Sequence, residues 1–190
     1  MRTFIAIELP ETIRSSLSKL QESLKETGSD VKWVEPHNIH LTLKFLGEIN
    51  EAKLEQVNAI LDTIAETNSS FCLRISELGA FPNIDCPKII WVGIDKGGAE
   101  TKKIAAFLEE KLSLIGFPKE SREFSTHITI GRIRSGKNRL KLVNDLDVKK
   151  EDFTGRNLET TVTKITLFKS SLSPKGPTYT TLKEASLKTA

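Results

Sequence analysis

The feature that most constrains the fold of this chain is an internal repeat with an offset of 87 residues. Shifting the sequence by that distance, without a gap, places residues 40–43 (His-Leu-Thr-Leu) on residues 127–130 (His-Ile-Thr-Ile), and residues 4–8 on residues 91–95. Apolar matches arise readily by chance, but histidine occurs only three times in the 190 residues, so the shared His-x-Thr carries the match. A repeat of this size predicts two similar structural units that bury their apolar faces together.

Hydrophobic periodicity predicts a strand, a helix and returning strands in each unit. Residues 4–9 have the pattern of a strand, and an apolar stripe over residues 13–24 indicates an amphipathic helix that ends near Gly28. Further helices are expected over residues 54–64, 104–115 and 137–148, and further strands over residues 39–45, 71–78, 88–94, 126–133, 160–168 and 178–187. We therefore predict the α+β class: one domain over residues 1–190, built from two pseudo-symmetric lobes of antiparallel sheet with outer helices and an active-site cleft between them.

The first His-x-Thr lies in a segment with strict alternation. The odd-numbered positions of residues 39–45 are apolar, whereas the even-numbered ones are His40, Thr42 and Lys44. Successive side chains of a strand point to opposite faces, so these three polar side chains are expected to share one face. Phe45, the last odd-numbered position, is expected in the core.

The second His-x-Thr has the same form. Its alternation places His127 and Thr129 on one strand face and Ile130 on the other. Simple alternation also assigns Arg132 to the apolar face, so that its guanidinium reaches the site only if the strand bends near Gly131. Each unit is thus predicted to present one imidazole and one hydroxyl, and the two strands to face each other across the cleft.

Two imidazoles and two hydroxyls suit one kind of reaction. Imidazole is the side chain best matched to proton transfer near neutral pH, and two of them supply an acid and a base in one step. Hydroxyls and backbone amides would hold the nonbridging oxygens of a phosphate. Such a site needs no metal, because one histidine can activate water while the other protonates the leaving oxygen of a phosphodiester.

Basic residues are concentrated around the second motif. Residues 119–150 carry nine Lys and Arg but four Asp and Glu, a larger excess than the +3 of the whole chain. Five of the nine follow the motif directly: Arg132, Arg134, Lys137, Arg139 and Lys141. A solvated, lysine-rich face is one interpretation, and a phosphate-attracting patch is the other.

Two alternatives to this chemistry remain at the level of sequence. A three-histidine zinc site would combine His37, His40 and His127, although His37 falls on the opposite strand face from His40 unless it lies in the preceding loop. A non-catalytic RNA-binding module would use the basic segment alone. The presence of His and Thr in both motifs argues against the second alternative.

Other features of the chain indicate where it works. Cys72 and Cys86 form no CxxC motif, which favours a reduced intracellular protein. The longest apolar run, residues 89–94, is far shorter than a membrane span, and Glu8 and Pro10 interrupt the apolar N-terminal patch, unlike a signal peptide. We expect a cytoplasmic monomer.

These segments resemble a known family. The chain is similar to the 2H phosphoesterases, which are named for two His-x-Thr or His-x-Ser motifs. Within them it is most similar to the RNA 2',3'-cyclic phosphodiesterases, also called 2'-5' RNA ligases. The resemblance spans the chain and rests on residues 40–47 and 127–132, with the flanking residues 2–7 and 172–179.

The resemblance implies hydrolysis of a terminal 2',3'-cyclic phosphate on RNA to a 2'-phosphate, without metal or other cofactor. His40 would donate a proton to the leaving 3'-oxygen, and His127 would accept one from water. Thr42 and Thr129 would bind the phosphate. The resemblance also implies ligation, the reverse of cleaving a 2'-5' linkage, in which the site would join a cyclic phosphate to a 5'-hydroxyl. The five basic residues that follow the second motif could hold the RNA backbone. Candidates for RNA contact are Lys44, Arg132, Arg134 and Tyr179. The indoles of Trp33 and Trp91 could stack on a base or pack in the core.

Overall fold

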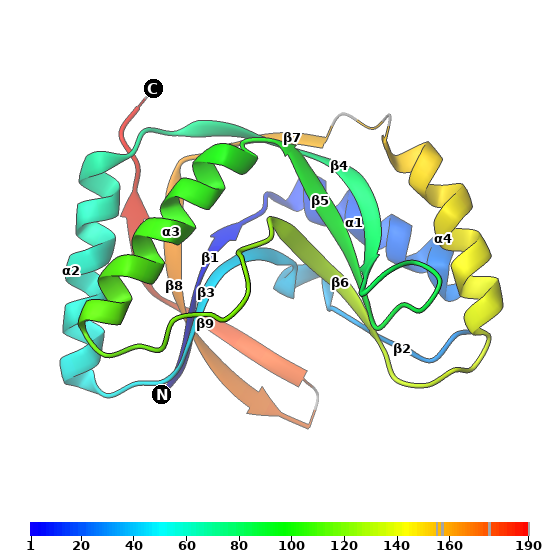
Figure 1. Ribbon diagram of the computed structural model, residues 1–190, viewed down its shortest axis with the longest axis horizontal. Coiled ribbons are helices and arrows are strands. Elements are labelled where there is room, and N and C mark those ends of the chain that lie inside the picture. The colour runs from blue at the N-terminus through cyan, green and yellow to red at the C-terminus, as the bar shows by residue number, and fades with distance from the viewer. Residues whose placement is uncertain (155, 157, 175, 190) are drawn as a thin grey trace.

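Two antiparallel sheets form the centre of the computed structural model, which describes residues 1–154, 156, 158–174 and 176–189 (Figure 1). Sheet A has the strand order β3-β1-β8-β9, and sheet B has the order β2-β6-β5-β4-β7. The strands of sheet A are β1 (Arg2–Glu8), β3 (His40–Glu48), β8 (Lys164–Ser173) and β9 (Gly176–Ser186). Those of sheet B are β2 (Val31–Trp33), β4 (Phe71–Phe81), β5 (Ile89–Lys96), β6 (His127–Ile133) and β7 (Leu158–Val162).

Helices cover the outer sides of both sheets, which confirms the predicted α+β class. The α-helices of the described residues are α1 (Glu11–Lys25), α2 (Glu51–Thr67), α3 (Gly98–Leu114) and α4 (Arg139–Thr154). A short 3₁₀ turn, η1 (Pro36–Asn38), precedes β3. The helix predicted over residues 137–148 is therefore longer than expected, and the three-residue strand β2 is too short to show a period in the sequence.

The two repeats exchange elements instead of forming one sheet each. Helix α1 follows β1 of sheet A but contacts β6 and α4 on the side of sheet B, whereas α3 follows β5 of sheet B but contacts β3 and α2 on the side of sheet A (Figure 1). Strand β4 of the first repeat completes sheet B, and β8 of the second completes sheet A. Each sheet thus needs both repeats, and one continuous apolar core joins them, from Ile5 and Ile7 to Ile128 and Ile130.

One predicted strand is divided between the two sheets. Residues 160–168 have the pattern of one strand, but β7 ends at Val162 in sheet B and β8 begins at Lys164 in sheet A. Residues on both sides of the break are buried, Val162 in one sheet and Ile165 in the other. The apolar pattern therefore continues while the pairing partner changes from β4 to β1.

Both motif strands contain a β-bulge at the same place in the repeat. In β3, Thr42 lies opposite Ala6 and Lys44 lies opposite Ile5, so Leu43 is an extra residue. In β6, Thr129 lies opposite Trp91 and Gly131 lies opposite Ile90, so Ile130 is the extra residue. An extra residue reverses the alternation of side chains beyond it.

The bulge in β3 exchanges the predicted places of Lys44 and Phe45. Lys44 was expected beside His40 and Thr42 as an RNA contact, but it is 5% exposed and faces α3. Phe45 was expected in the core, but it is 60% exposed and packs against Phe4 on the opposite face, with 6.0 Å between ring centroids. Both expectations were wrong because strict alternation does not survive an extra residue.

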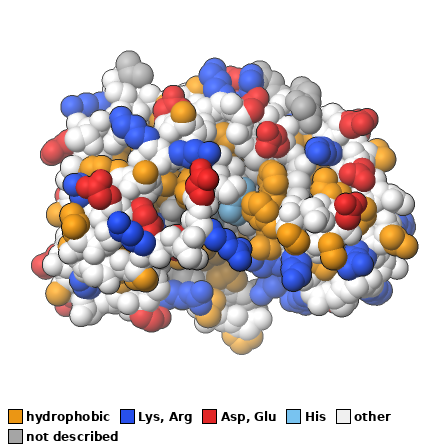
Figure 2. All heavy atoms as spheres, in the orientation of Figure 1, with side chains coloured by type: hydrophobic (Ala, Val, Ile, Leu, Met, Phe, Trp, Pro, Cys, Tyr) orange, Lys and Arg blue, Asp and Glu red, His pale blue; other side chains and the backbone are white. Residues whose placement is uncertain are grey.

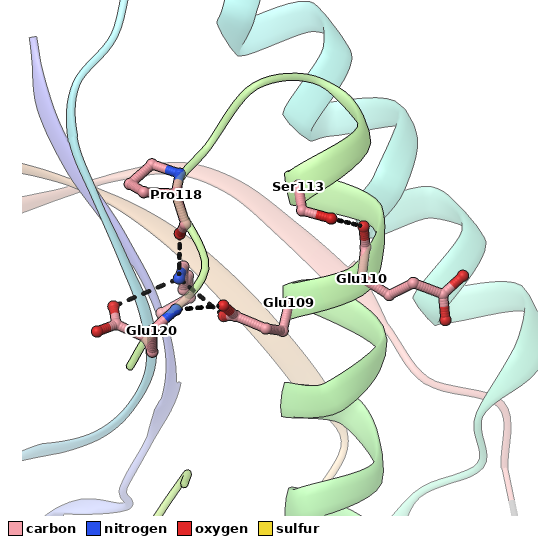
Figure 3. Close-up of polar contacts among 6 residues, drawn as sticks. Glu109, Glu110, Ser113, Pro118 and Glu120 are labelled. Carbon is pink, nitrogen blue, oxygen red and sulfur yellow. Dashed lines mark hydrogen bonds and ion pairs between the residues drawn. The ribbon is translucent and has the colours of Figure 1, made fainter. Parts of the chain in front are cut away.

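The buried ammonium of Lys44 joins β3 to α3 and the segment that follows it. Its Nζ lies 2.7 Å from a carboxylate oxygen of Glu109, 3.3 Å from one of Glu120 and 3.0 Å from the carbonyl oxygen of Pro118 (Figure 3). Burial alone raises the pKa of Glu109, but hydrogen bonds from Lys44 and from the backbone N–H of Glu120 bring it below the ordinary value. A lysine so engaged is not available to a phosphate.

Replacing Lys44 by Met is expected to destabilise the fold by about 2 kcal/mol, because the carboxylate of Glu109 loses its charged partner inside the structure. Urea unfolding followed by circular dichroism measures the change. The matched control is Lys102→Met on the exposed side of α3, where about 0.5 kcal/mol or less is expected. Equal stability of the two variants would show that the buried ion pair contributes nothing net.

Candidate active site

The two motif histidines lie at corresponding places on two strands that contact each other. His40 is the first residue of β3 and His127 is the first residue of β6, and these two strands pack together although they belong to different sheets. Figure 2 shows histidine side chains inside a recess between the two sides of the molecule, with Lys and Arg side chains on its rim. The recess is the candidate active site.

Each histidine ring is held by the same kind of hydrogen bond. Nδ1 of His40 lies 2.7 Å from the carbonyl oxygen of Asn38, and Nδ1 of His127 lies 2.9 Å from the carbonyl oxygen of Ser125. A carbonyl oxygen only accepts, so Nδ1 carries the hydrogen in both rings. This leaves Nε2 of each imidazole for proton transfer with a substrate.

His40 lies among aromatic rings. Its centroid is 4.9 Å from that of Phe4, and Tyr179 meets it edge-on at 5.4 Å. Burial of this ring lowers its pKa below the ordinary value, while the hydrogen bond to Asn38 and the carboxylate of Glu8 oppose the shift. His40 is therefore mainly neutral near pH 7 in the free protein.

His127 has different neighbours. The ring of Phe81 meets it edge-on, with centroids 5.0 Å apart, and Trp91 lies 5.2 Å from Phe81. The indole of Trp91 covers Gly79 so closely that a Cβ there would lie 2.5 Å from it. Glycine at this position is thus what lets the tryptophan lie against the strand, beside Thr129.

The structure brings the predicted hydroxyls to the same strand faces as the histidines. Thr42 and Thr129 each lie two residues beyond a histidine and before the bulge, where the alternation still holds, and both are partly exposed. Each motif strand therefore presents one imidazole and one hydroxyl on one face, in two matching pairs. Their roles in catalysis stay predictions at this point.

Arg132 reaches the site face because of the bulge in β6. It lies opposite Ile89 on one side and Lys32 on the other, which returns it to the face of His127 and Thr129. Regular alternation assigned Arg132 to the apolar face unless the strand bends near Gly131. The extra residue Ile130 provides that irregularity.

The positive charge of Arg132 also affects the pKa of Tyr179, which lies on sheet A. Burial raises the pKa of Tyr179, and the positive charges of Arg2 and Arg132 oppose this. Tyr179 itself packs edge-on against the ring of His40. Arg2 and Lys32, which the motifs did not indicate, add cations to the same faces.

The rest of the basic segment leads away from the histidines. Arg134 is exposed just beyond the end of β6, and its backbone N–H bonds to the carbonyl of Asp30. Arg139 and Lys141 belong to α4, and the Lys141 ammonium lies 3.4 Å from the carbonyl oxygen of Glu26 near the end of α1. The basic residues that follow the second motif are therefore divided: Arg132 lies on the strand face of His127, and the start of α4 lies beside the end of α1.

The three histidines do not form a metal site. His37 is exposed in η1, and among the described residues no three His, Cys, Asp or Glu side chains gather as metal ligands would. The three-histidine zinc alternative therefore has no support in the geometry.

In the same described part of the chain, every helix falls short of the length and apolarity needed to cross a membrane. Lys175, in the segment 172–179, lies outside the described residues.

A comparison with known families identifies the chain. The sequence pattern described as LigT like Phosphoesterase matches it twice in succession, over residues 7–91 and residues 92–179. The chain belongs to this family of LigT-like phosphoesterases. The two matches follow the two repeats, each with one His-x-Thr motif.

Individual relatives are similar over nearly the whole chain. A protein of Methanocaldococcus jannaschii named RNA 2',3'-cyclic phosphodiesterase is 37% identical over 184 residues, which cover 97% of this chain and 99% of the relative. One of Aquifex aeolicus with the same name is 35% identical over 189 residues, covering 97% and 96%.

Solved structures of the family share the fold. The crystal structure of TT0787 of Thermus thermophilus has a TM-score of 0.80 and 30% identity, covering 100% of this chain and 99% of that one. Escherichia coli LigT complexed with 3'-AMP has a TM-score of 0.78 and 25% identity, covering 98% and 97%.

The lowered pKa of His40 is testable by NMR titration of the histidine ring protons. We expect this resonance to titrate below the ordinary value of 6.5, and Tyr179→Ala to raise the pKa by exposing the ring to water. Glu8→Gln is expected to lower it further, because a carboxylate that favours the charged ring is lost. Leu140→Ala, on the exposed side of α4, is the control.

The lowered pKa of His40 also makes the free energy of unfolding depend on pH. Between the lowered pKa of folded His40 and about 6.5, the unfolded chain binds more protons, so this group's contribution to stability rises with pH and is lost as pH falls. A His40 resonance that titrates at or above the ordinary value in the wild type would contradict the burial argument.

Proposed function

We propose that this protein hydrolyses a terminal 2',3'-cyclic phosphate on RNA to a 2'-phosphate, with its two histidines as general acid and general base and no metal ion. The observation that carries the proposal is the matched pair of imidazoles. Each has Nδ1 fixed on a backbone carbonyl and a threonine two residues further along the same strand face. The names of the relatives support the RNA cyclic phosphate as the substrate class.

The reaction is an in-line displacement at phosphorus. His127 Nε2 takes a proton from water as the water oxygen bonds to phosphorus. The bond between phosphorus and the 3'-oxygen breaks, and His40 Nε2 gives its proton to that oxygen, which leaves as a hydroxyl. Thr42 and Thr129 donate hydrogen bonds to the nonbridging oxygens, where negative charge accumulates. The product keeps its phosphate on the 2'-oxygen.

The different surroundings of the two histidines support their different roles. His40 must be protonated to act as the acid, yet burial disfavours its charged form in the free protein. A phosphodiester anion bound beside it favours the charged form, so substrate binding brings proton uptake with it. His40 therefore carries the proton that it donates once the anionic substrate is bound.

The same arrangement operates in both directions. In reverse, His40 removes the proton from a 3'-hydroxyl and His127 gives one to a leaving oxygen, by microscopic reversibility. If a 5'-hydroxyl takes the place of water in attacking the cyclic phosphate, His127 accepts its proton and a 2'-5' linkage forms. Ligation and hydrolysis therefore share one set of residues and differ in the nucleophile.

An oligonucleotide with a terminal 2',3'-cyclic phosphate, incubated with the protein in EDTA, is expected to yield the 2'-phosphate at the rate seen without EDTA. Chromatography against both phosphate isomers identifies the product. Loss of activity on chelation that is restored by added metal would refute the metal-free mechanism. A pure 3'-phosphate product would refute the assignment of the leaving oxygen.

His40→Ala and His127→Ala are each expected to reduce kcat by about 10²–10⁴-fold, the usual contribution of a positioned acid or base. His37→Ala is the matched control, because this exposed histidine of η1 has no role in the proposal. Initial rates on the cyclic phosphate measure the effect. A histidine whose alanine variant turns over like the wild type has no place in the mechanism.

A further inference from the structure

A hollow lies between α1 and α4, two helices that pack together on the side of sheet B (Figure 1). Its walls are residues 19–23 of α1, residues 149–153 of α4, and Arg156, which follows α4. The volume of the hollow is about 200 Å³. Sites that enclose a drug-sized ligand measure roughly 300–1,000 Å³, so this one suits a smaller group. None of its residues belongs to the two motifs or takes part in the proposed hydrolysis.

Both helices direct a lysine and an apolar side chain at the hollow. Side chains that are three or four residues apart on a helix share a face. On α1 this face carries Lys19, Leu20 and Ser23, and on α4 it carries Lys149 and Phe153. Leu20 and Phe153 are buried and form an apolar floor, whereas the two ammonium groups approach the hollow from different helices.

The third cation at the hollow, Arg156, is held by an aromatic ring. Its guanidinium lies over the ring of Phe153, 5.9 Å from the centroid, and its backbone N–H donates to the carbonyl of Phe153 at 3.0 Å. Asp152 lies four residues before this arginine, a spacing that favours an ion pair on a helix. Within the described residues the two side chains nevertheless form no ion pair, and the guanidinium keeps its N–H donors for another partner.

The polar groups around the hollow are largely unsatisfied by the protein. In the part of the chain that the structure describes, the ammonium of Lys19 pairs with no carboxylate and the hydroxyl of Ser23 makes no hydrogen bond. Lys149 has only a long contact with Asp145, at 3.7 Å. The described lining holds three cations against one carboxylate, an excess of 3 − 1 = 2 positive charges. Such a concentration of donors and positive charge attracts an anion.

The donors at the hollow match the oxygens of a phosphate group. Ammonium and guanidinium groups form charge-assisted hydrogen bonds with phosphate, and a guanidinium can bind two of its oxygens at once. The hydroxyl of Ser23 adds a further donor. The ionised carboxylate of Asp152 can only accept, so it suits a hydroxyl on the ligand, such as that of a ribose or of hydrogen phosphate.

We propose that the hollow between α1 and α4 is a second anion site, which binds a phosphate group separately from the histidine recess. The phosphate comes either from the RNA chain upstream of the reacting end or from free phosphate in solution. Arg139 and Lys141 at the start of α4 continue the basic surface from the second motif along this helix to Lys149. The inference concerns binding, and it holds or fails independently of the proposed hydrolysis.

The first test is an NMR titration of the protein with inorganic phosphate in a phosphate-free buffer. The backbone amides of Ser23 and Phe153 report on the hollow, and the histidine ring protons report separately on the recess. In the wild type both amides are expected to shift and to saturate. In the double variant with Lys19→Gln and Arg156→Gln, the affinity seen at these amides is expected to fall by about tenfold or more, because two charged donors are lost.

A matched control removes the same charge elsewhere. Lys102→Gln combined with Lys103→Gln takes two positive charges from the exposed side of α3 and is expected to leave the titration of both amides unchanged. Thermal unfolding of each double variant shows whether the fold is intact, as expected for exposed positions.

A second test distinguishes the two sources of the phosphate. KM is measured on a dinucleotide and on an RNA of about twelve nucleotides, both ending in a 2',3'-cyclic phosphate, at fixed ionic strength. If the group belongs to the RNA chain, the variant at the hollow raises KM for the longer RNA and leaves the dinucleotide unaffected. If the source is free phosphate, the variant loses phosphate binding at the hollow while KM for both RNAs stays at the wild-type value.

Two results of the titration overturn the inference. In one, the amides of Ser23 and Phe153 do not shift with phosphate in the wild type. In the other, the variant at the hollow binds phosphate there as well as the wild type does, or the control on α3 loses the same factor. A protein that hydrolyses neither RNA but binds phosphate at the hollow overturns the proposed function and leaves the anion site standing.

Discussion

The extra residue in each motif strand is the constraint on which the site depends. Before the bulge, alternation places a histidine and a threonine on one strand face. Beyond it, the reversed alternation places Phe45 or Arg132 on the same face, so that each motif strand presents three such side chains there. A regular strand would instead expose Lys44 and bury Phe45.

The bulges are also where the exchanged helices hold the motif strands. On α1, the buried amide of Gln21 donates to the carbonyl of Ile130, the extra residue of β6, and to that of Val34. On the other side, Lys44 follows the extra residue of β3 and pairs with Glu109 of α3. Each helix thus fixes the motif strand at the point where its alternation reverses, although the two contacts use different chemistry. Buried polar groups are stable only when they are paired in this way.

Nearly identical motifs acquire different properties from their surroundings. Asn38 is buried, and its side-chain amide donates to the carbonyl of Pro177 while its own carbonyl holds His40. Ser125, which corresponds to it in the second repeat, is exposed. The β8–β9 hairpin that carries Tyr179 is therefore tied to one histidine alone. Asymmetric packing thus gives the two histidines of a symmetric repeat different surroundings.

The sequence by itself determined the repeat, the α+β class, most of the helices and strands, and the two His-x-Thr positions at its centre. These follow from local periods and from residue types, which do not depend on what each segment packs against. Only the tertiary structure decided which side chains share the site face beyond Thr42 and Thr129, and that residues 160–168 divide between two sheets. It also decided that α1, which follows a strand of sheet A, contacts β6 of sheet B, and that α3, which follows a strand of sheet B, contacts β3 of sheet A. The physical reason is that the register of a strand is set by its partner. One unpaired residue reverses the side chains that follow it until the next irregularity, and pairing between distant segments leaves no periodic trace in the chain.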